Sequence, residues 1–276
     1  MGMLQIDENK CKKDGICARE CPTNLILLQE GSGYPDMVPW ADSVCTRCGH
    51  CVAVCPHGAL VHTKIPMGDC PSIEKDLSIN EAQALQFLRS RRSIRLYREK
   101  PVEPEKIRRL IEAARYAPTG GNTQMVEWLV LTDRATINKV AGMAAEWIRQ
   151  ALKDDPQFAA GAPYLPMIVK AWDDGIDSIL RNAPVLIVAT VPKEALNGMV
   201  DLTLALSYLD LMAPTMMGLG TCWAGLLQRA LLSSLPLRET LGIPIDHPHH
   251  YPMMLGYPAV KYYRLPARKP PKITFK

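Results

Sequence analysis

From about residue 78 onward, the chain carries long segments in which apolar residues recur at helical spacing. The first predicted helix runs from Ser78 toward Arg91, because a serine followed three residues later by Glu81 forms a capping box. A second helix is predicted to begin near Pro104, a residue suited to the first helical turn, and to end before Pro118. Its apolar stripe consists of Ile107, Leu110, Ile111 and Ala114.

Short apolar runs between these segments are typical of strands. Residues 127–132 and 184–191 are predicted strands, and 251–255 is a weaker candidate. The segment 198–220 is apolar enough to suggest a membrane span, but Asp201 and Asp210 would each be costly in a bilayer. We therefore expect a buried helix there, in the core or at a subunit interface.

Seven of the nine cysteines lie in the first 55 residues, in two runs. The run from Cys45 to Pro56 has the spacing C-x2-C-x2-C-x3-C-P, which is typical of bacterial iron–sulfur proteins. The run from Cys11 to Pro22 has the same form, except that Asp14 stands at the second cysteine position. These features predict an iron–sulfur domain over residues 1–64, a linker rich in Gly and Pro over 65–79, and a different domain over 80–276.

In two-cluster proteins, the fourth cysteine of each run binds the cluster of the other run. The complete 4Fe–4S cluster is then assigned to Cys45, Cys48, Cys51 and Cys21. The other cluster is assigned to Cys11, Cys17 and Cys55, with or without Asp14. A carboxylate is a weaker ligand for iron than a thiolate, so this cluster is either 4Fe–4S or 3Fe–4S. Residues 3–64 resemble bacterial two-cluster ferredoxins, in which both outcomes occur.

Zinc and disulfides explain the cysteines less well. Zinc sites usually use paired C-x2-C or Cys/His motifs, and a disulfide framework would need an oxidising compartment, whereas the first residues show no secretory signal. The nearby His50, His57 and His62 are expected to be solvated loop residues with no assigned role. Cys70, in the linker, is interpreted as a plain thiol, with recruitment by a nearby cluster as the alternative.

The overall composition excludes little. The chain has 276 residues, 47% of them hydrophobic, and a net charge of +4, with no run of basic residues interleaved with aromatics. Neither nucleic-acid binding nor a membrane location is therefore expected, and a cytoplasmic location is predicted.

Three separated segments of the second domain carry candidate cofactor chemistry. Residues 91–95, Arg-Arg-Ser-Ile-Arg, offer forked donors to a phosphate, although a basic helix end is an ordinary feature. Residues 117–124 and 218–225 are rich in small residues that allow close backbone approach to a flat ligand. Gly256-Tyr257-Pro258 and then Arg268-Lys269-Pro270 follow.

In this order, the segments resemble the nitroreductase-like flavoproteins over roughly residues 80–276. The resemblance implies an α+β fold, so that the expected fold class is a ferredoxin-like two-cluster module followed by a nitroreductase-like α+β flavin domain. It also implies a homodimer that binds FMN at the subunit interface. The implied phosphate and ribityl ligands are Arg91, Arg92, Ser93, Arg95, Arg268 and Lys269. The implied contacts with the flavin ring are Pro118, Thr119, Gly120, Asn122 and Gln124 of the partner subunit, and Cys222, Trp223, Ala224 and Gly225.

The resemblance further implies an FMN-dependent oxidoreductase that reduces a small organic acceptor, such as a nitroaromatic or another conjugated electrophile. Ferredoxin or NAD(P)H would donate the electrons. The alternative is an electron-transfer or redox-sensing protein without a dedicated organic substrate. Gln124 is followed by Met125-Val126 instead of the common Pro-Trp, so this face of the pocket is expected to differ. Residues 146–177 are interpreted as an insertion that selects the substrate, or whose aromatics simply pack it down.

Overall fold

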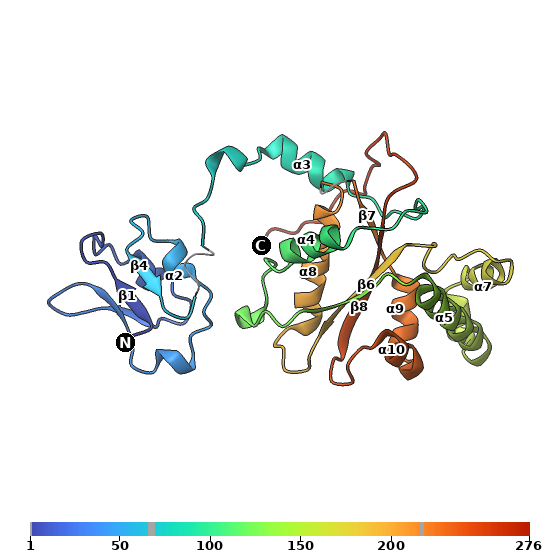
Figure 1. Cartoon of the computed structure of the whole chain (residues 1–276), viewed down its shortest axis with the longest axis horizontal. Helices are drawn as coiled ribbons and strands as arrows, with labels where there is room; N and C mark the ends of the chain where they lie inside the picture. The colour runs from blue at the N-terminus through green and yellow to red at the C-terminus, as the bar shows by residue number, and fades with distance from the viewer. Residues whose placement is uncertain (1, 66–69, 216–217) are drawn as a thin grey trace. The chain divides into compact units, whose positions relative to one another are not determined.

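The computed structural model describes residues 2–65, 70–215 and 218–276, and these form two compact units (Figure 1). The first unit contains residues 1–78 together with 121–123, and the second contains 79–120 and 124–276. Four residues of the predicted linker, 66–69, lie outside the described part, as do residues 216–217 of the predicted 198–220 helix. No described helix is long and apolar enough to cross a membrane.

The first unit is built from two short antiparallel strand pairs and two short helices. Strand β1 (Leu4–Ile6) pairs with β4 (Leu60–His62), and β2 (Ile26–Leu28) pairs with β3 (Pro35–Met37). Helices α1 (Ile16–Glu20) and α2 (His50–Ala53) each fall inside one cysteine run, and a 3-10 turn, η1, covers Ala41–Ser43. Its small core consists of Leu4, Cys17, Ile26, Cys51 and Leu60.

The second unit is a four-stranded antiparallel sheet covered by helices on both faces (Figure 1). The strand order is β5-β6-β8-β7. The bounds are β5 (Glu127–Leu131), β6 (Val185–Val191), β7 (Gly220–Trp223) and β8 (His249–Gly256). All seven residues of β6 are buried, because alternate side chains enter the two cores on either face.

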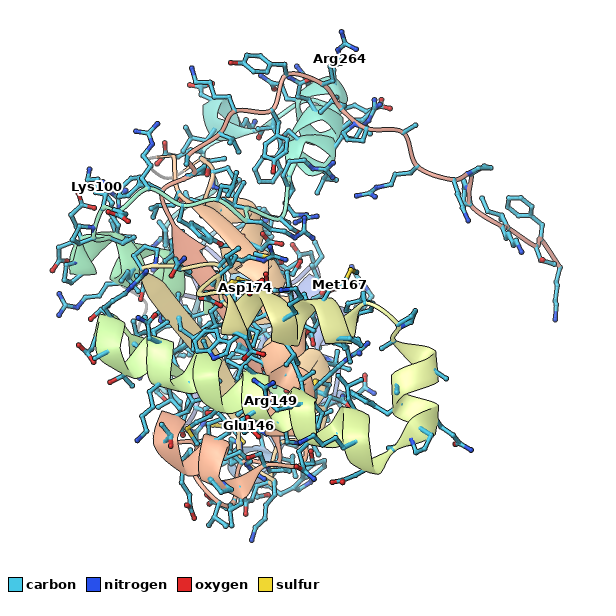
Figure 2. The ribbon with its side chains drawn as sticks, turned by 90° about the vertical axis from the view of Figure 1, so that its right-hand side faces the viewer. Lys100, Glu146, Arg149, Met167, Asp174 and Arg264 are labelled. Atoms are coloured by element: carbon cyan, nitrogen blue, oxygen red, sulfur yellow. The ribbon has the colours of Figure 1, made fainter. Side chains whose placement is uncertain are left out.

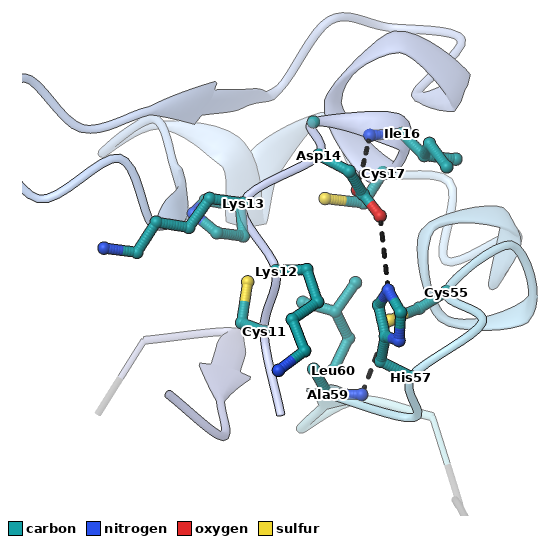
Figure 3. A pocket seen from close by; sticks show the side chains of 12 residues that line it. Cys11, Lys12, Lys13, Asp14, Ile16, Cys17, Cys55, His57, Ala59 and Leu60 are labelled. Atoms are coloured by element: carbon teal, nitrogen blue, oxygen red, sulfur yellow. Dashed lines mark hydrogen bonds and ion pairs between the residues drawn. The ribbon is translucent and has the colours of Figure 1, made fainter. Parts of the chain in front are cut away.

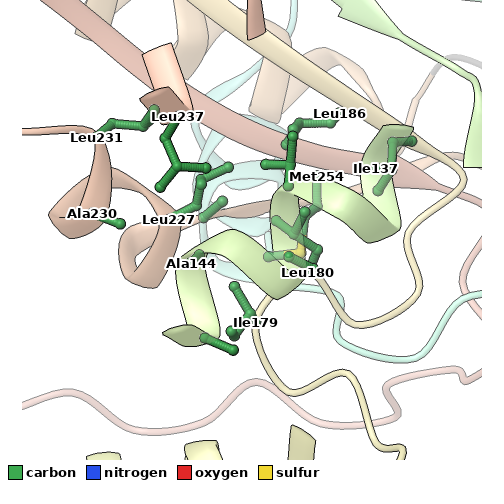
Figure 4. Close-up of a cluster of buried hydrophobic side chains, with 14 of the residues drawn as sticks. Ile137, Ala144, Ile179, Leu180, Leu186, Leu227, Ala230, Leu231, Leu237 and Met254 are labelled. Atoms are coloured by element: carbon green, nitrogen blue, oxygen red, sulfur yellow. The ribbon is translucent and has the colours of Figure 1, made fainter. Parts of the chain in front are cut away.

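The core on one face is formed against α4 (Pro104–Ala114) and α8 (Gly198–Met212). The opposite core contains Ile137, Leu186, Leu227 and Met254 (Figure 4). Its helices are α5 (Arg134–Asp154), α7 (Leu165–Asp173), α9 (Gly225–Leu231) and α10 (Leu235–Leu241). Mixed helices and an antiparallel sheet confirm the predicted α+β class.

The predicted helix at 104–118 and the predicted strands are present, but one helix start is wrong. Helix α3 covers Glu81–Ser90, and its cap is Asn80, whose side chain and that of Gln83 form the reciprocal capping box. The cap predicted at Ser78 fails because this second pair has the same spacing two residues later, and Ser78 instead ends a 3-10 turn, η3 (Lys75–Leu77).

The segment 146–177 is mostly helical: it contains the end of α5, then α6 (Pro156–Gly161) and α7. Trp147 meets Phe158 edge-on at 5.8 Å between ring centroids, and Arg149 on α5 pairs with Glu146 and Asp173 at 3.0 and 2.6 Å (Figure 2). These contacts favour the packing interpretation of its aromatics over a role at a ligand.

Two glycines let an extended segment cross the end of the sheet. Gly220 and Gly256 are a register pair of β7 and β8. A Cβ on Gly256 would lie 2.7 Å from both Pro184 Cδ and Tyr97 Cδ1, and one on Gly220 would overlap Ile94. Residues 94–97 can therefore lie against β7, where Ile94 N–H donates to Thr221 O at 2.8 Å.

Candidate iron–sulfur and flavin sites

The two cysteine runs adopt the same local backbone conformation. Cys11 and Cys45 lie 34 positions apart, and Gly15 and Gly49, which precede α1 and α2, have φ angles of 69° and 75°. In each run the last cysteine accepts a hydrogen bond from a backbone N–H four residues later. Leu25 donates to Cys21 Sγ at 3.3 Å, and Ala59 donates to Cys55 Sγ at 3.4 Å. Such donors stabilise the thiolate form that binds iron.

The four cysteines assigned to the complete cluster line one cavity. Cys21 from the first run faces Cys45, Cys48 and Cys51 from the second, with His62 beside them. Burial acts to raise the pKa of Cys21, but the hydrogen bonds from Leu25 and Thr23 outweigh it and lower that pKa. Burial raises the pKa of Cys51 to about 11, so this thiol loses its proton readily only to a strong cation such as cluster iron.

His62 is not a solvated loop residue, contrary to expectation. It is 1% exposed, it lies on β4, and burial lowers its pKa, so the ring is neutral near pH 7. Its Nδ1 accepts a hydrogen bond from Lys64 N–H at 3.1 Å, which assigns the ring proton to Nε2. Nε2 lies 3.6 Å from Cys45 Sγ and is therefore a donor to that sulfur.

The cysteines assigned to the second cluster line another cavity, which is shown in Figure 3. It is bordered by Cys11, Cys17, Cys55, Asp14 and His57. The carboxylate of Asp14 accepts a hydrogen bond from Ile16 N–H at 3.1 Å and lies 3.6 Å from His57 Nε2. Asp14 therefore lies just before the cap residue Gly15 of α1 and faces His57 as well as the cavity, and the sequence interpretation did not predict this contact.

The donor set of the first unit fits clusters better than a single ion. Within the described residues, no three His, Cys, Asp or Glu side chains converge on one metal position. The thiols surround two hollows instead, as the separate corners of a cubic cluster require. The individual ligands stay predictions.

The cationic segment 91–95 lies along β7, next to Trp223. Arg91 Nη1 lies 3.4 Å from Asp210 Oδ2, and the same oxygen accepts from Trp223 Nε1 at 3.0 Å. Neither Arg92 nor Arg95 forms an ion pair in the part of the chain that the structure describes. Two uncompensated guanidinium groups beside a serine form a donor set that fits a phosphate.

The segment after Gly220 is partly strand, which the sequence analysis did not predict. Cys222 is buried, and burial raises the pKa of its thiol against the opposing influence of Arg95 and Arg181, which makes it a packing residue at neutral pH. The N–H of Ala224 donates to Pro252 O at 3.0 Å, which satisfies that donor within the chain. Gly225 begins α9.

The loop 118–124 is held in an unusual backbone conformation. Gly121, Asn122 and Gln124 have positive φ angles of 60°, 55° and 52°. Thr119 Oγ1 accepts from Gln124 N–H at 3.0 Å, and Asp201 Oδ1 of α8 accepts from Gly120 N–H at 3.0 Å. Left-handed non-glycine residues are costly and concentrate at functional sites.

Arg268 and Lys269, the predicted phosphate ligands of the tail, are not brought to segment 91–95. Residues 261–276 are all exposed, and Figure 2 shows the chain beyond Arg264 extending away from the body of its unit. Within one chain, Arg268 and Lys269 therefore lie apart from the other residues predicted to bind the phosphate.

Comparison with known proteins assigns both units. Residues 88–257, more than half of the chain, match the family model described as "Nitroreductase family". The chain belongs to the nitroreductase family. Residues 5–59 match a 4Fe-4S dicluster domain. The predicted FMN and two iron–sulfur clusters are thereby confirmed as the cofactor classes of these two domains, and the nitroreductase-family domain makes the protein an FMN-dependent oxidoreductase.

Relatives of the nitroreductase-family domain agree. A protein from Archaeoglobus fulgidus with the provisional name NADH dehydrogenase/NAD(P)H nitroreductase is 26% identical over 180 residues, which is 64% of this chain and 86% of the relative. FMN-bound nitroreductase structures from Bacteroides fragilis and Desulfitobacterium hafniense each align with a TM-score of 0.56, at 21% and 20% identity. They cover 71% and 72% of this chain and 99% of their own. These two likenesses show the fold.

Proposed function

We propose that this nitroreductase-family protein receives electrons through two iron–sulfur clusters and delivers them by way of FMN to a small organic acceptor, such as a nitroaromatic or another conjugated electrophile. The observation that carries the proposal is the joining, in one chain, of two cysteine-lined cavities with a flavin-type domain. Clusters transfer single electrons and FMN releases two as a pair, so the clusters would load the flavin stepwise. Covalent fusion raises the effective concentration of the donor at the flavin.

FMN would be held by the residues that fit it: Arg91, Arg92, Ser93 and Arg95 for the phosphate side, with Trp223 and Gly225 toward the ring. When bound, FMN supplies the electron-pair transfer to the acceptor. The chain's own residues supply cationic donors, and the buried Thr221 and the half-buried Trp223 share the face of β7 that adjoins Asp210.

A homodimer would complete this site. Val200, Leu204, Tyr208 and Met212 repeat every four residues on α8 and are 56%, 38%, 41% and 36% exposed, although the opposite face of α8 is buried. An apolar stripe of this kind on a central helix favours a partner of the same kind. The partner subunit would contribute residues 118–124 and the tail residues Arg268 and Lys269. An iron–sulfur flavoprotein of this composition would work in a reducing cytoplasm, with ferredoxin or NAD(P)H as its electron donor.

Removal of residues 1–64 tests the electron route. The truncated protein should keep FMN and be reduced by dithionite, but it should lose reduction by ferredoxin-type donors. The measurement is anaerobic stopped-flow absorbance of the flavin with a reduced ferredoxin, with the full chain as reference. Equal rates for both proteins would contradict the route through the clusters. Flavin reduction with no turnover of any nitroaromatic, enone or halogenated acceptor would indicate an electron carrier instead.

A further inference from the structure

Asp210 is a buried carboxylate that joins three segments of the nitroreductase-family domain. It lies near the end of α8, a mostly apolar helix whose other aspartate is Asp201, and is 4% exposed. Its Oδ1 accepts a hydrogen bond from the hydroxyl of Thr221 on β7. Its Oδ2 accepts from Trp223 Nε1 at 3.0 Å and lies 3.4 Å from Arg91 Nη1. Each carboxylate oxygen therefore has a defined donor.

Packing does not explain an aspartate at this position. A buried ion pair is weak evidence for stability, because an apolar side chain of similar volume usually packs at least as well. The arrangement does fix directions: Arg91 is tethered through one guanidinium nitrogen, and Trp223 through its indole nitrogen. A guanidinium group has five N–H donors, so most of those of Arg91 stay available to an anion.

We propose that Asp210 is a positioning residue for the flavin: it orients Arg91 toward the phosphate side and Trp223 toward the ring. This inference rests on the proposed FMN site. One side chain, that of Asp210, would then align Arg91, which lies 119 positions away in the sequence, and Trp223, which lies 13 positions away. Without the carboxylate, Arg91 would lose its only described ion-pair partner and sample several rotamers, at a cost in binding.

A double-mutant cycle on the full-length protein tests the proposal. The variants are Asp210→Asn, Arg91→Ala and their combination, and the measurement is the dissociation constant of FMN by flavin fluorescence after removal of the flavin. Asp210→Asn alone should weaken FMN binding by about tenfold to a hundredfold, the range for one hydrogen bond to a charged group. In the Arg91→Ala background, the same change should weaken it several-fold less than in the wild type, because only the effect transmitted through Trp223 remains.

Asp177→Asn is the matched control. Asp177 is also a buried carboxylate, 7% exposed, but its partners among the described residues are the backbone N–H groups of Ile179, Leu180 and Asn182. This variant should lower the thermal stability and leave the FMN affinity within about twofold, whereas a general effect of losing any buried carboxylate would lower both.

A second variant decides the question if Asp210→Asn does not fold, or if Arg91→Ala binds too weakly for the cycle. Thr221→Val removes the donor to Oδ1, keeps the shape, and leaves Arg91 intact; it should weaken FMN binding by a few fold and change the visible circular dichroism of the bound flavin. The inference would be overturned if Asp210→Asn bound FMN as tightly as the wild type, or if the effects in the cycle were additive. Where Asp210→Asn does not fold or Arg91→Ala binds too weakly, wild-type affinity of Thr221→Val would overturn it instead. Failure of the wild type to bind FMN would overturn the proposed function itself.

Discussion

His62 donates its Nε2 proton toward the sulfur of Cys45, 3.6 Å away, while Lys64 N–H occupies the other ring nitrogen. Hydrogen bonds to cluster sulfurs stabilise the reduced, more negative state and raise the reduction potential. His62→Phe should therefore lower the potential of the complete cluster by tens of millivolts, since a tenfold change in the one-electron equilibrium is about 60 mV. Potentiometric titration monitored by electron paramagnetic resonance measures the shift. The control is Val61→Phe, which alters a side chain on the same strand that is 41% exposed, and equal potentials for both variants would contradict the prediction.

Asp14 is predicted to make one cluster labile. Asp14→Cys should increase the iron content to about eight per chain and remove any 3Fe–4S signal, because a fourth thiolate holds the corner iron. Anaerobic iron and sulfide analysis with electron paramagnetic resonance gives both quantities. Asp42→Cys places a cysteine outside both runs of the same unit and should change neither. A wild-type protein that already holds eight irons after exposure to air would show that Asp14 binds iron firmly.

The tail residues Arg268 and Lys269 are predicted to complete the phosphate site. Their joint replacement by alanine should weaken FMN binding by about tenfold or more, since charge-assisted hydrogen bonds to the phosphate are lost. Fluorescence titration measures the affinity, and joint replacement of Lys272 and Lys276 controls for loss of tail charge. If both double variants bind alike, the tail makes no specific contact with the phosphate.

The exposed stripe of α8 is predicted to bury itself in a dimer. Leu204→Glu should shift sedimentation toward the monomer and reduce bound FMN in the same samples, because flavin and dimer are linked by mass action if both subunits form the site. Leu232→Glu alters a side chain that is 66% exposed elsewhere on the unit, and it should leave both unchanged. A Leu204→Glu monomer with full FMN content would separate flavin binding from assembly.

Acid should destabilise the nitroreductase-family domain through His250. Burial, aided by the charge of Arg238, lowers the pKa of His250 to about 4, whereas the unfolded chain binds this proton near pH 6.5. Below pH 6.5 the unfolded state therefore gains a proton that the folded state does not. Stability is unaffected above that pH, and on the order of 2 kcal/mol is lost as the pH falls toward 4. Urea unfolding followed by tryptophan fluorescence at pH 7 and 5 should show a shallower pH dependence for His250→Gln than for the wild type or His249→Gln.

The sequence predicted the parts of this fold whose hydrophobic pattern is local. The apolar stripe of α4 predicts a helix and the continuous apolar run of β6 predicts a buried strand, and both elements are present. The start of α3 was wrong by two residues, because Ser78–Glu81 and Asn80–Gln83 fit the same capping pattern. Strand β7 was missed because only four residues form it, within a glycine-rich motif whose Gly220 serves close packing against Ile94.

In the candidate flavin site, too, the sequence did not predict contacts between residues that are far apart along the chain. Charge and small residues drew attention to Arg91 and Trp223, but their common partner, Asp210, served at the sequence level only to argue against a membrane span. Its role depends on a contact across 119 positions, for which one sequence has no periodic or spacing signal. His57 and His62 were passed over for a related reason, since burial on a strand or opposition to an aspartate comes only from the folded arrangement.

The small core of the first unit has a consequence for the life of the protein in a cell. Two of its five members, Cys17 and Cys51, are predicted iron ligands, so little apolar packing would persist without the clusters. Because each run is predicted to supply its last cysteine to the cluster of the other run, each cluster would cross-link the two halves of the unit. Oxidative damage to the iron should then loosen the whole unit and expose it to proteolysis, so that the cell would clear a failed electron carrier by ordinary turnover.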